Sequence, residues 1–397
     1  MFSRRDFLKQ ATLLSLAPTV PAFLGRTARD VAPERDGRVL VVVQLDGGND
    51  GINTIIPFAD EGYAKHRTAL RLPTDRLVKI NNHVGLHPSL RDVEKLLQGG
   101  QLAIVQGVSY PNPNRSHFRS MAIWHTARFD SEEHDGPGWL GRALDGTRPR
   151  AGTPASIYSG IETVPVALRG RRCEAAALSR LDDFKLDLPL NPRPIFSNTE
   201  AVGDLTSFVR RSLLDAYTTA ERMTETANRP DEGSSYPATG LADRLRLIAR
   251  LLKAGCETRV FYTGQGGYDT HSNQLPEHAI LLNELGTALK VFLDDLKAAK
   301  LADRVVVLIF SEFGRRVGEN ASKGTDHGTA GPVFLAGPAV QAGLLGTTPS
   351  LLDLENGDLK VGIDFRRIYA TVLEGWLGLD AKTSLGGTFE HLPLFRS

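Results

Sequence analysis

Short apolar runs rich in β-branched residues recur along the chain, and each gives way to polar or glycine-rich turns. The clearest runs cover residues 39–45, 102–108 and 305–310, and a shorter one covers 332–335. Continuous apolar runs of this length are typical of strands buried on both faces of a largely parallel sheet. The pattern therefore predicts an α/β protein with helices on both sides of such a sheet.

Apolar residues at three- and four-residue spacing predict helices between these strands. One stripe lies within 282–296, after Pro276, and another within 241–252; both are interpreted as core-facing. Residues from about 130 to 255 have weaker strand signals and are interpreted as a helical cap or insertion on a domain spanning 37–397. The polar, turn-rich stretch 228–235 is predicted to be a linker.

The first thirty residues have the pattern of an export signal. Residues 3–9 read Ser-Arg-Arg-Asp-Phe-Leu-Lys, and a moderately apolar stretch with two prolines follows over 11–24. That stretch is shorter than the roughly 18 apolar residues of a spanning helix. Residues 1–30 are therefore predicted to be a twin-arginine signal peptide that directs the protein to the periplasm or another extracytoplasmic location, with no stable membrane span after its removal. The alternative is an amphipathic N-terminal helix that carries two arginines.

Composition narrows the class of protein. Apolar residues make up 41% and charged residues 23% of the 397 residues, which is typical of a soluble globular protein. Lys and Arg number 47 against 46 Asp and Glu, so nucleic acid is not an expected partner. With Cys173 and Cys256 alone, a disulfide framework and a cysteine-rich zinc finger are excluded. Whether these two cysteines pair is left open.

Two polar clusters follow the first two strong strands. Asp46 and Asp50 lie in a glycine-rich turn after the first strand, where carboxylates could hold a divalent cation; the alternative is a plain tight turn. Ser116 follows a Pro-Asn-Pro turn at the expected start of a helix, between Arg115 and Arg119. A helix N-terminus favours a bound anion, so Ser116 is a candidate nucleophile and the arginines candidate anion donors. The alternative is that Ser116 only caps the helix.

The third cluster places Asp269 and His271 two residues apart in a loop that begins with two glycines. Zinc sites use histidine nitrogen and aspartate oxygen, so this pair is suited to one metal ion. His278 either extends the set or faces solvent. The alternative for the whole cluster is an ordinary surface loop.

The fourth cluster joins the strongest strand to the next one. Glu312 follows the end of the strand over 305–310, and Asp326 and His327 lie in a glycine-rich loop before 332–335. Core packing gives no good reason for two ionisable residues, Asp326 and His327, between two buried strands. Their presence therefore favours a role as metal ligands. The alternative is a solvated loop.

The order of these groups resembles the alkaline phosphatase and sulfatase superfamily, whose members carry metal ligands on successive strand-end loops. More narrowly, the chain is similar to the exported family called domain of unknown function 1501. The motifs that carry this resemblance are the leader, Gly-Gly-x-Asp-Gly at 47–51, Ser-His-Phe at 116–118, Tyr-Asp-Thr-His at 268–271, Ser-Glu-Phe-Gly-Arg at 311–315 and Asp-His-Gly at 326–328. The resemblance implies a three-layer, alkaline-phosphatase-like α/β sandwich with a largely parallel central sheet.

The resemblance also implies roles for particular residues. The first-strand ligand would be Asp50 by the narrower family's pattern or Asp46 by its place at the strand end, and Ser116 would be the nucleophile. The other implied ligands are Asp269, His271, Glu312 and His327, with Asp326 beside the last. Phe313 stands where a histidine ligand is expected, which implies a weak, altered or absent second metal site. The motif Cys-x-Pro-x-Arg is absent, so a formylglycine sulfatase is not expected.

The first functional hypothesis is a metal-dependent hydrolase of phosphate esters or related anionic esters, in which Ser116 attacks the ester. The metal is expected to be zinc, with manganese or calcium as alternatives. Arg115, Arg119 or Arg315 would hold the non-bridging oxygens of a small anionic ester or a cell-envelope substrate. The second hypothesis, favoured by Phe313, is a non-catalytic exported binding or assembly factor with a protein partner. A third is hydrolysis or modification of envelope glycans or sulfated sugars through a different nucleophile.

Overall fold

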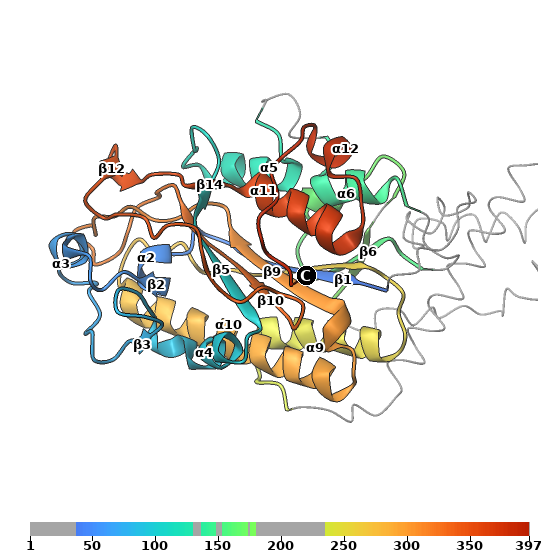
Figure 1. Ribbon diagram of the computed structural model, residues 1–397, viewed down its shortest axis with the longest axis horizontal. Coiled ribbons are helices and arrows are strands. Elements are labelled where there is room, and N and C mark those ends of the chain that lie inside the picture. Colours follow the sequence, from blue (N-terminus) through green and yellow to red (C-terminus); the bar gives the residue numbers. More distant parts are fainter. Residues whose placement is uncertain (1–36, 130–135, 148–152, 174, 180–234, 397) are drawn as a thin grey trace, which may run out of the picture.

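A computed structural model describes residues 37–129, 136–147, 153–173, 175–179 and 235–396 of the chain. Its centre is a mixed sheet in the order β11-β5-β10-β9-β1-β8-β6-β7, with β14 also paired to β5 (Figure 1). The strands are β1 (Val39–Leu45), β5 (Leu102–Ser109), β6 (Ser156–Ser159), β7 (Ala175–Leu178), β8 (Val260–Gln265), β9 (Val305–Ser311), β10 (Gly331–Ala336), β11 (Gly343–Leu345) and β14 (Ile363–Asp364). The smaller pairings use β2 (Ile55–Ile56), β3 (Val78–Lys79), β4 (Gly85–Leu86), β12 (Leu354–Glu355) and β13 (Asp358–Leu359).

Helices cover both faces of the sheet (Figure 1). On one face lie α4 (Arg91–Gln98), α9 (Gly240–Lys253) and α10 (Gln274–Ala298). On the other lie α5 (His117–Thr126), α6 (Trp139–Leu144), α11 (Phe365–Ala370) and α12 (Ala381–Leu385), with a π-helical turn over Thr371–Leu377. Two short helices, α2 (Gly51–Thr54) and α3 (Glu61–His66), lie beside the smaller sheets. The predicted three-layer α/β architecture is confirmed.

The central strand β1 is buried along its whole length, which explains its unbroken apolar run. Val39, Val41 and Val43 point into the core under α9 and α10, whereas Leu40 and Val42 point into the core under α5 and α11. Because side chains alternate between the faces of a strand, a strand with helices on both sides needs apolar residues at every position. The unbroken apolar run of β1 therefore arises because helices cover both faces of the sheet.

Strand direction gathers the ends that carry chemistry. β1 is parallel to both β8 and β9, and Leu45 is in register with Gln265 and Ser311. β10 runs antiparallel to both β9 and β5, so its N-terminal end lies at the edge where β1, β5, β8 and β9 end. Open α/β sheets bind ligands outside the carboxyl ends of their strands. The loops after β1, β5, β8 and β9 and the loop before β10 therefore meet at one place.

The two predicted helical stripes are confirmed as α9 and α10. The predicted cap region is described in part: β6 and β7 join the central sheet and α9 packs on α10, while 130–135, 148–152, 174 and 180–234 lie outside the described residues. The predicted leader, and the predicted linker except its last residue, also lie outside them. Cys173 and Cys256 are not bridged to each other.

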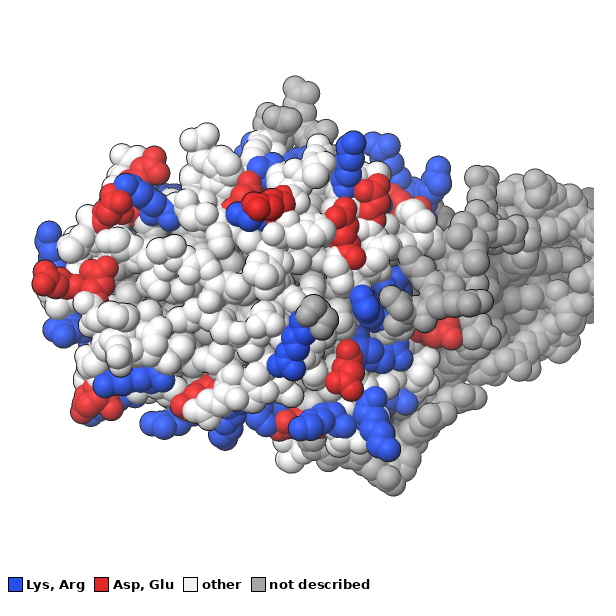
Figure 2. Space-filling view, viewed as in Figure 1, with Lys and Arg blue, Asp and Glu red and all other residues white. Residues whose placement is uncertain are grey.

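No helix among the described residues is both long enough and apolar enough to cross a membrane. On the face shown in Figure 2, side chains of both charge signs are interspersed. This distribution agrees with the near-neutral composition.

Truncation of a core-facing residue on α10 tests the assigned packing. Leu289 is 1% exposed in the core between α10 and the sheet, whereas Leu352 is 53% exposed. We expect Leu289→Ala to lower the free energy of unfolding by about 2–5 kcal/mol, because it removes buried apolar atoms and leaves a cavity. The matched control Leu352→Ala should change it by less than about 0.5 kcal/mol. Chemical denaturation measures both values, and equal losses would contradict the packing.

Candidate metal centre

Asp269, in the loop after β8, lies at the centre of a cluster of nitrogen donors. Its Oδ1 atom is 3.0 Å from His271 Nε2, 3.1 Å from His327 Nε2 and 3.5 Å from His117 Nε2. One ligand atom from each of His117, Asp269 and His327 lies within 4.8 Å of the others. The start of α5 and two loops that are distant in the sequence therefore place imidazole and carboxylate groups around one point.

The donor set of this cluster is suited to a divalent metal ion. Histidine nitrogen and carboxylate oxygen are the ligands that zinc and its neighbours bind. His117 Nε2 is buried and has no hydrogen-bond partner within the described part of the chain. A buried polar atom without a partner is unfavourable, and a bound cation at this point would satisfy it. The residues present therefore fit a divalent cation.

Glu312 orients His117 instead of lying in the cluster itself. Glu312 is buried, with 1% of its surface exposed. Its Oε1 atom lies 2.8 Å from His117 Nδ1 and also accepts a hydrogen bond from Gly47 N–H. The hydrogen bond to Glu312 raises the pKa of His117. A carboxylate behind a ligating histidine fixes the tautomer and directs the other ring nitrogen at the metal. The structure therefore favours an orienting role for Glu312 over the predicted ligand role.

The packing of α5 explains why His117 reaches this carboxylate. Ser120 lies one helical turn after His117, and its hydroxyl donates to the Glu312 carbonyl at 2.5 Å. Side chains three residues apart share one face of a helix, so this face lies against the end of β9. The sequence reasoning used His117 only as part of a motif and missed it as a ligand. Its place one residue into a helix that follows a strand ending at the same edge was the available signal.

The other two histidines are also held through their second ring nitrogen. His327 Nδ1 is 2.7 Å from the Arg115 carbonyl oxygen, and His271 Nδ1 is 3.2 Å from Asp326 Oδ1. The two Nε2 atoms are 2.9 Å apart. The structure thus brings Asp269, His271 and His327 together as the sequence predicted, while Asp326 contacts His271 from the solvent side.

Arg315 holds the loops of the cluster together. Its side chain is fully buried and donates to the carbonyl oxygens of Gly47, Gly48, Thr325 and Tyr268. It also donates to Asp269 Oδ1 at 2.6 Å. Burial alone would raise the pKa of Asp269, but the hydrogen bond and charge of Arg315 lower it to about 2. Because its donors are used within the protein, Arg315 is not available for the predicted contact with ester oxygens.

Arg115 and Arg119 are likewise engaged elsewhere. The Arg115 guanidinium forms an ion pair with the buried carboxylate of Asp358. The Arg119 guanidinium donates to the carbonyl oxygen of Phe129 at 2.5 Å. The predicted role of Arg115 in holding substrate oxygens is therefore not supported by its contacts. Its backbone carbonyl instead supports His327.

Ser116 is exposed at the N-cap of α5, directly before His117. Its side chain makes no capping hydrogen bond, so the alternative of a serine that only caps the helix is not what the structure shows. The backbone N–H of Ser116 donates to Asn114 Oδ1 at 2.8 Å. Ser116 therefore lies at the start of the helix, next in sequence to His117, and its hydroxyl does not cap the helix.

Asp50, one of the two residues predicted as the ligand after the first strand, does not lie in the cluster. It is 0% exposed and forms a two-pronged ion pair with Arg67, with Oδ–Nη distances of 2.5 and 3.0 Å. Gln274 also donates to Asp50 Oδ2 at 2.5 Å. Burial would raise the pKa of Asp50, but the charge and hydrogen bonds of Arg67 hold it below its usual range. The structure argues against Asp50 as a metal ligand, because it lies outside the cluster and because Arg67 and Gln274 together use both of its carboxylate oxygens.

Asp46 lies half-buried at the end of β1, outside the cluster. The amide nitrogen of Gln44 donates to its Oδ1 atom. The pKa of Asp46 is raised to about 6, mainly by burial and further by the nearby charges of Glu312 and Glu162.

His278 neither joins the candidate ligands nor faces solvent. It is buried on α10, where its Nε2 atom lies 2.9 Å from Asn49 Oδ1, and burial lowers its pKa to about 3.

The ring of Phe313 packs against two histidines of the cluster, at the sequence position where a histidine ligand was expected. Its ring centroid is 4.9 Å from those of His117 and His327. Gly48 closes over the same ring: a Cβ atom there would lie 2.3 Å from Phe313 Cε2, and its φ of +73° also requires glycine. A second metal at this position would lack the expected imidazole ligand.

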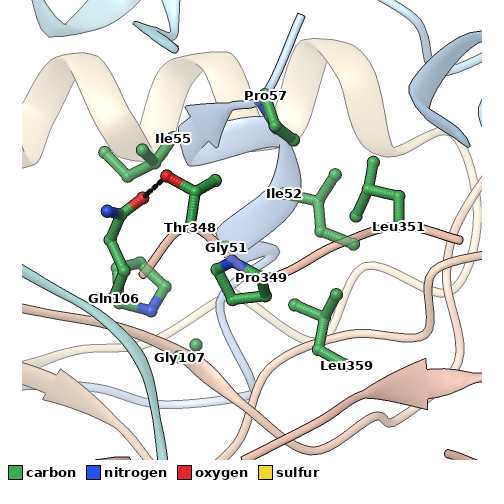
Figure 3. Close-up of a pocket in the computed structure, with 12 residues that line it drawn as sticks. Gly51, Ile52, Ile55, Pro57, Gln106, Gly107, Thr348, Pro349, Leu351 and Leu359 are labelled. Atoms are coloured by element: carbon green, nitrogen blue, oxygen red, sulfur yellow. Dashed lines mark hydrogen bonds between the residues drawn. The ribbon is translucent and has the colours of Figure 1, made fainter. Parts of the chain in front are cut away.

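A separate pocket lies between α2 and the β5 side of the sheet (Figure 3). Apolar side chains such as Ile52, Ile55 and Leu351 line it, and its polar side chains Gln106 and Thr348 bond to each other at 3.0 Å. None of its lining residues is ionisable. The groups able to perform chemistry are therefore at the metal cluster and not in this pocket.

The sequence profile of a family described as "Protein of unknown function (DUF1501)" matches residues 38–387. The chain therefore belongs to this family, which confirms the narrower resemblance drawn from the motifs. No curated protein that was compared matches the chain.

Several solved structures resemble the fold at low identity. Murine ectonucleotide pyrophosphatase/phosphodiesterase 5, an inactive variant in complex with AMP, is 12% identical with a TM-score of 0.42, covering 87% of this chain and 96% of its own. A sulfatase from Pseudoalteromonas is 10% identical with a TM-score of 0.40, covering 96% and 74%. A Vibrio parahaemolyticus protein described as in the alkaline phosphatase superfamily is 11% identical with a TM-score of 0.35, covering 89% and 76%. These values are low, so the chemistry of the site is argued from its own residues.

Neutralisation of Asp50 separates a structural from a ligating carboxylate. We expect Asp50→Asn to lower the free energy of unfolding by about 3–5 kcal/mol, because it leaves the Arg67 charge buried without a counter-charge. In a titration with zinc, the folded Asp50→Asn protein is expected to give the same result as the unaltered protein, whereas Asp269→Asn is expected to bind less, because Asp269 lies in the cluster of candidate ligands and Asp50 does not. Denaturation and metal titration measure the two effects. Loss of zinc binding in folded Asp50→Asn with unchanged stability would restore Asp50 as a ligand.

Proposed function

We propose that the protein is an exported, metal-dependent hydrolase of phosphate esters or related anionic esters. The observation that carries the proposal is the meeting of His117, Asp269 and His327 at one point, with a buried Nε2 atom of His117 that has no hydrogen-bond partner among the described residues. The residue before His117 in the sequence is Ser116, the N-cap of α5, and its side chain makes no capping hydrogen bond. A cation site next to a hydroxyl at a helix start is the arrangement that ester hydrolysis through a serine requires.

In this proposal His117, Asp269 and His327 hold one divalent cation, with His271 as a further ligand. Zinc suits this set of imidazole and carboxylate groups, and manganese or calcium are the alternatives. When bound, the cation would polarise the ester oxygens and offset the negative charge that develops on them. Glu312, the Arg115 carbonyl and Asp326 keep the three imidazoles directed inward. Arg315 keeps Asp269 ionised over the physiological pH range.

Ser116 is the proposed nucleophile. Its hydroxyl would lose its proton to solvent as its oxygen bonds to phosphorus, and the bond to the leaving oxygen would break with its electron pair going to that oxygen. Water would then attack phosphorus and lose a proton, the bond from phosphorus to the serine oxygen would break, and that oxygen would take a proton to restore the hydroxyl. The backbone N–H groups at the start of α5 provide a positive partial charge for the ester oxygens. Arg115, Arg119 and Arg315 are not needed for this contact, which agrees with their internal bonds.

A single cation is proposed instead of a pair. Glu312, the strand-end acid of the expected second site, is engaged by His117, Gly47 N–H and the Ser311 hydroxyl. Its neighbour Phe313 offers no ligand atom. Export through the twin-arginine leader and a periplasmic location remain part of the proposal on the strength of residues 3–9.

Metal content tests the proposed centre. The purified protein should contain close to one divalent cation per chain, and a chelator should lower its melting temperature because the cation binds the folded state. His327→Ala should lose the cation, whereas the control His83→Ala, at an exposed histidine far from the cluster in sequence, should retain it. Elemental analysis of the dialysed proteins measures this. Equal metal content in all variants would contradict the site.

Removal of the serine hydroxyl tests the proposed reaction. The metal-loaded protein should turn over an aryl phosphate or phosphodiester, and Ser116→Ala should lower kcat by at least about 100-fold with unchanged metal content. Full activity of Ser116→Ala would move the nucleophile elsewhere. A metal-loaded wild-type protein that hydrolyses none of a panel of phosphate, phosphonate and sulfate esters would favour the non-catalytic binding factor.

A further inference from the structure

The hairpin formed by β12 and β13 carries a buried carboxylate at Asp358. Glu355 pairs with Asp358 across the hairpin, so the turn between the two strands consists of Asn356 and Gly357. Both turn residues have positive φ, +53° and +82°, which is the geometry of a type I′ turn and suits the sequence Asn-Gly. The short turn therefore fixes the place at which the hairpin presents Asp358.

Asp358 lies between two arginines, each of which precedes or follows a residue of the candidate site in the sequence. Asp358 is 1% exposed, its Oδ2 atom forms an ion pair with Arg115 Nη2, and its Oδ1 atom lies 3.8 Å from Arg316 Nε. Among the described residues, Oδ1 has no hydrogen-bond partner. Removal of one partner of a buried ion pair is strongly unfavourable, because an uncompensated buried charge is left. Asp358 therefore holds the Arg115 guanidinium in place.

The same hairpin is bonded to the segment between β9 and β10, which contains His327. The Asn356 carbonyl oxygen accepts a hydrogen bond from Arg316 Nη1 at 2.6 Å, and the Leu359 carbonyl oxygen accepts one from the Thr329 hydroxyl at 2.7 Å. Thr329 follows His327 by two residues. The hairpin thus contacts both the segment before α5 and the segment that carries His327.

Arg115 connects the hairpin to a candidate ligand. Its carbonyl oxygen lies 2.7 Å from His327 Nδ1. A carbonyl oxygen only accepts hydrogen bonds, so Nδ1 must carry the ring proton and Nε2 keeps the lone pair that a metal ion can bind. That Nε2 atom is 3.1 Å from Asp269 Oδ1, inside the cluster. Because the guanidinium of Arg115 is held by Asp358, the movement of its backbone carbonyl is limited.

We propose that Asp358 is a positioning residue of the metal centre, whose ion pair with Arg115 holds the carbonyl that keeps His327 Nε2 available as a ligand atom. This inference rests on the proposed function, because it requires a cation at the cluster. Asp358 lies outside the cluster and acts through Arg115. Groups that orient a ligand from outside the coordination sphere commonly change metal affinity by about 10–100-fold.

Zinc affinity, measured by competition with a chromophoric chelator, tests the proposal. Asp358→Asn keeps the shape of the side chain and removes its charge, and water can reach the Arg115 side chain, which is 38% exposed, so the variant should fold. We expect its zinc Kd to rise by about 10–100-fold. Unchanged zinc affinity in Asp358→Asn would overturn the inference.

The matched control is Asp295→Asn. Asp295 is 4% exposed and also pairs with a basic side chain, Lys253 at 2.9 Å. It lies about 30 Å along α10 from Gln274, at 1.5 Å per residue. The control should lose stability without a change in zinc Kd. Equal losses of zinc affinity in the two variants would assign the effect to general destabilisation and overturn the inference.

A double-mutant cycle tests the route through Arg115. Arg115→Gln removes the guanidinium and keeps the backbone carbonyl, so it should weaken zinc binding as Asp358→Asn does. The double variant should bind zinc no more weakly than either single variant, because the two residues act as one pair. Losses that add in the double variant would overturn the inference. If Asp358→Asn does not fold, Arg115→Gln decides alone, and unchanged zinc affinity there has the same meaning.

The ring proton of His327 provides a spectroscopic readout that a general loss of stability would not change. In histidine-labelled protein, the Nδ1 proton bonded to the Arg115 carbonyl should give a ¹H–¹⁵N signal, assigned by its absence in His327→Ala. We expect Asp358→Asn to lose this signal and Asp295→Asn to keep it. Retention of the signal in Asp358→Asn would overturn the inference.

The outcomes separate this inference from the function on which it rests. Full zinc affinity in Asp358→Asn leaves the metal centre and the hydrolase proposal intact, and only the role of Asp358 fails. A wild-type protein that binds no zinc, manganese or calcium overturns both.

Discussion

The contact between Arg315 and Asp269 is the interaction on which the candidate site depends. A fully buried guanidinium requires a counter-charge and acceptors for its donors, and Arg315 finds them in Asp269 and in carbonyls from three loops. These are the loops after β1 and β8 and the loop before β10. The same contact keeps Asp269 ionised and directs its Oδ1 atom at three imidazoles. Two backbone hydrogen bonds, from Tyr268 N–H to the Asp46 carbonyl and from Thr325 N–H to the Thr270 carbonyl, join the same loops and support this contact.

The division of electrostatic environments follows from this arrangement. The buried Arg315 guanidinium lowers the pKa of Asp269 to about 2. Burial, together with the charges of Glu312 and Glu162, raises the pKa of Asp46 to about 6. His117 is raised in pKa by Glu312, while the deeper His125 and His278 are kept neutral by burial. One edge of a sheet therefore offers a permanently ionised carboxylate, an oriented imidazole and a carboxyl group able to carry a proton.

The sequence predicted the layers of the fold because their physical cause is local. A strand covered on both faces needs the unbroken apolar run of β1 or β9, and a helix on the core needs the stripe of α10. The strands β6 and β7 were missed because they are four residues long and contain Ser and Ala in place of β-branched runs. The antiparallel direction of β10 depends on its neighbours and has no signal within its own residues.

The meeting of Asp269, His271 and His327 was predictable because the first two lie in the loop after β8 and the third in the loop before β10, and both loops lie at the same edge of the sheet. Asp50 could not be excluded, since its partner Arg67 lies in a loop 17 residues away and pairs only in the folded chain. Glu312 was predicted as a ligand of the cluster itself, whereas the packing of α5 places the His117 ring against its carboxylate, which the strand-end pattern alone does not indicate. Arg315 looked like an anion donor, since its burial arises only from the convergence of the loops.

The most direct test of the central claim is the X-ray absorption spectrum of the zinc-loaded protein at the zinc edge. We predict two or three imidazole nitrogens at about 2.0–2.1 Å together with carboxylate oxygen, and a loss of the imidazole signal in Asp269→Asn. A zinc ion surrounded by sulfur, or by oxygen with no imidazole scattering, would contradict the account.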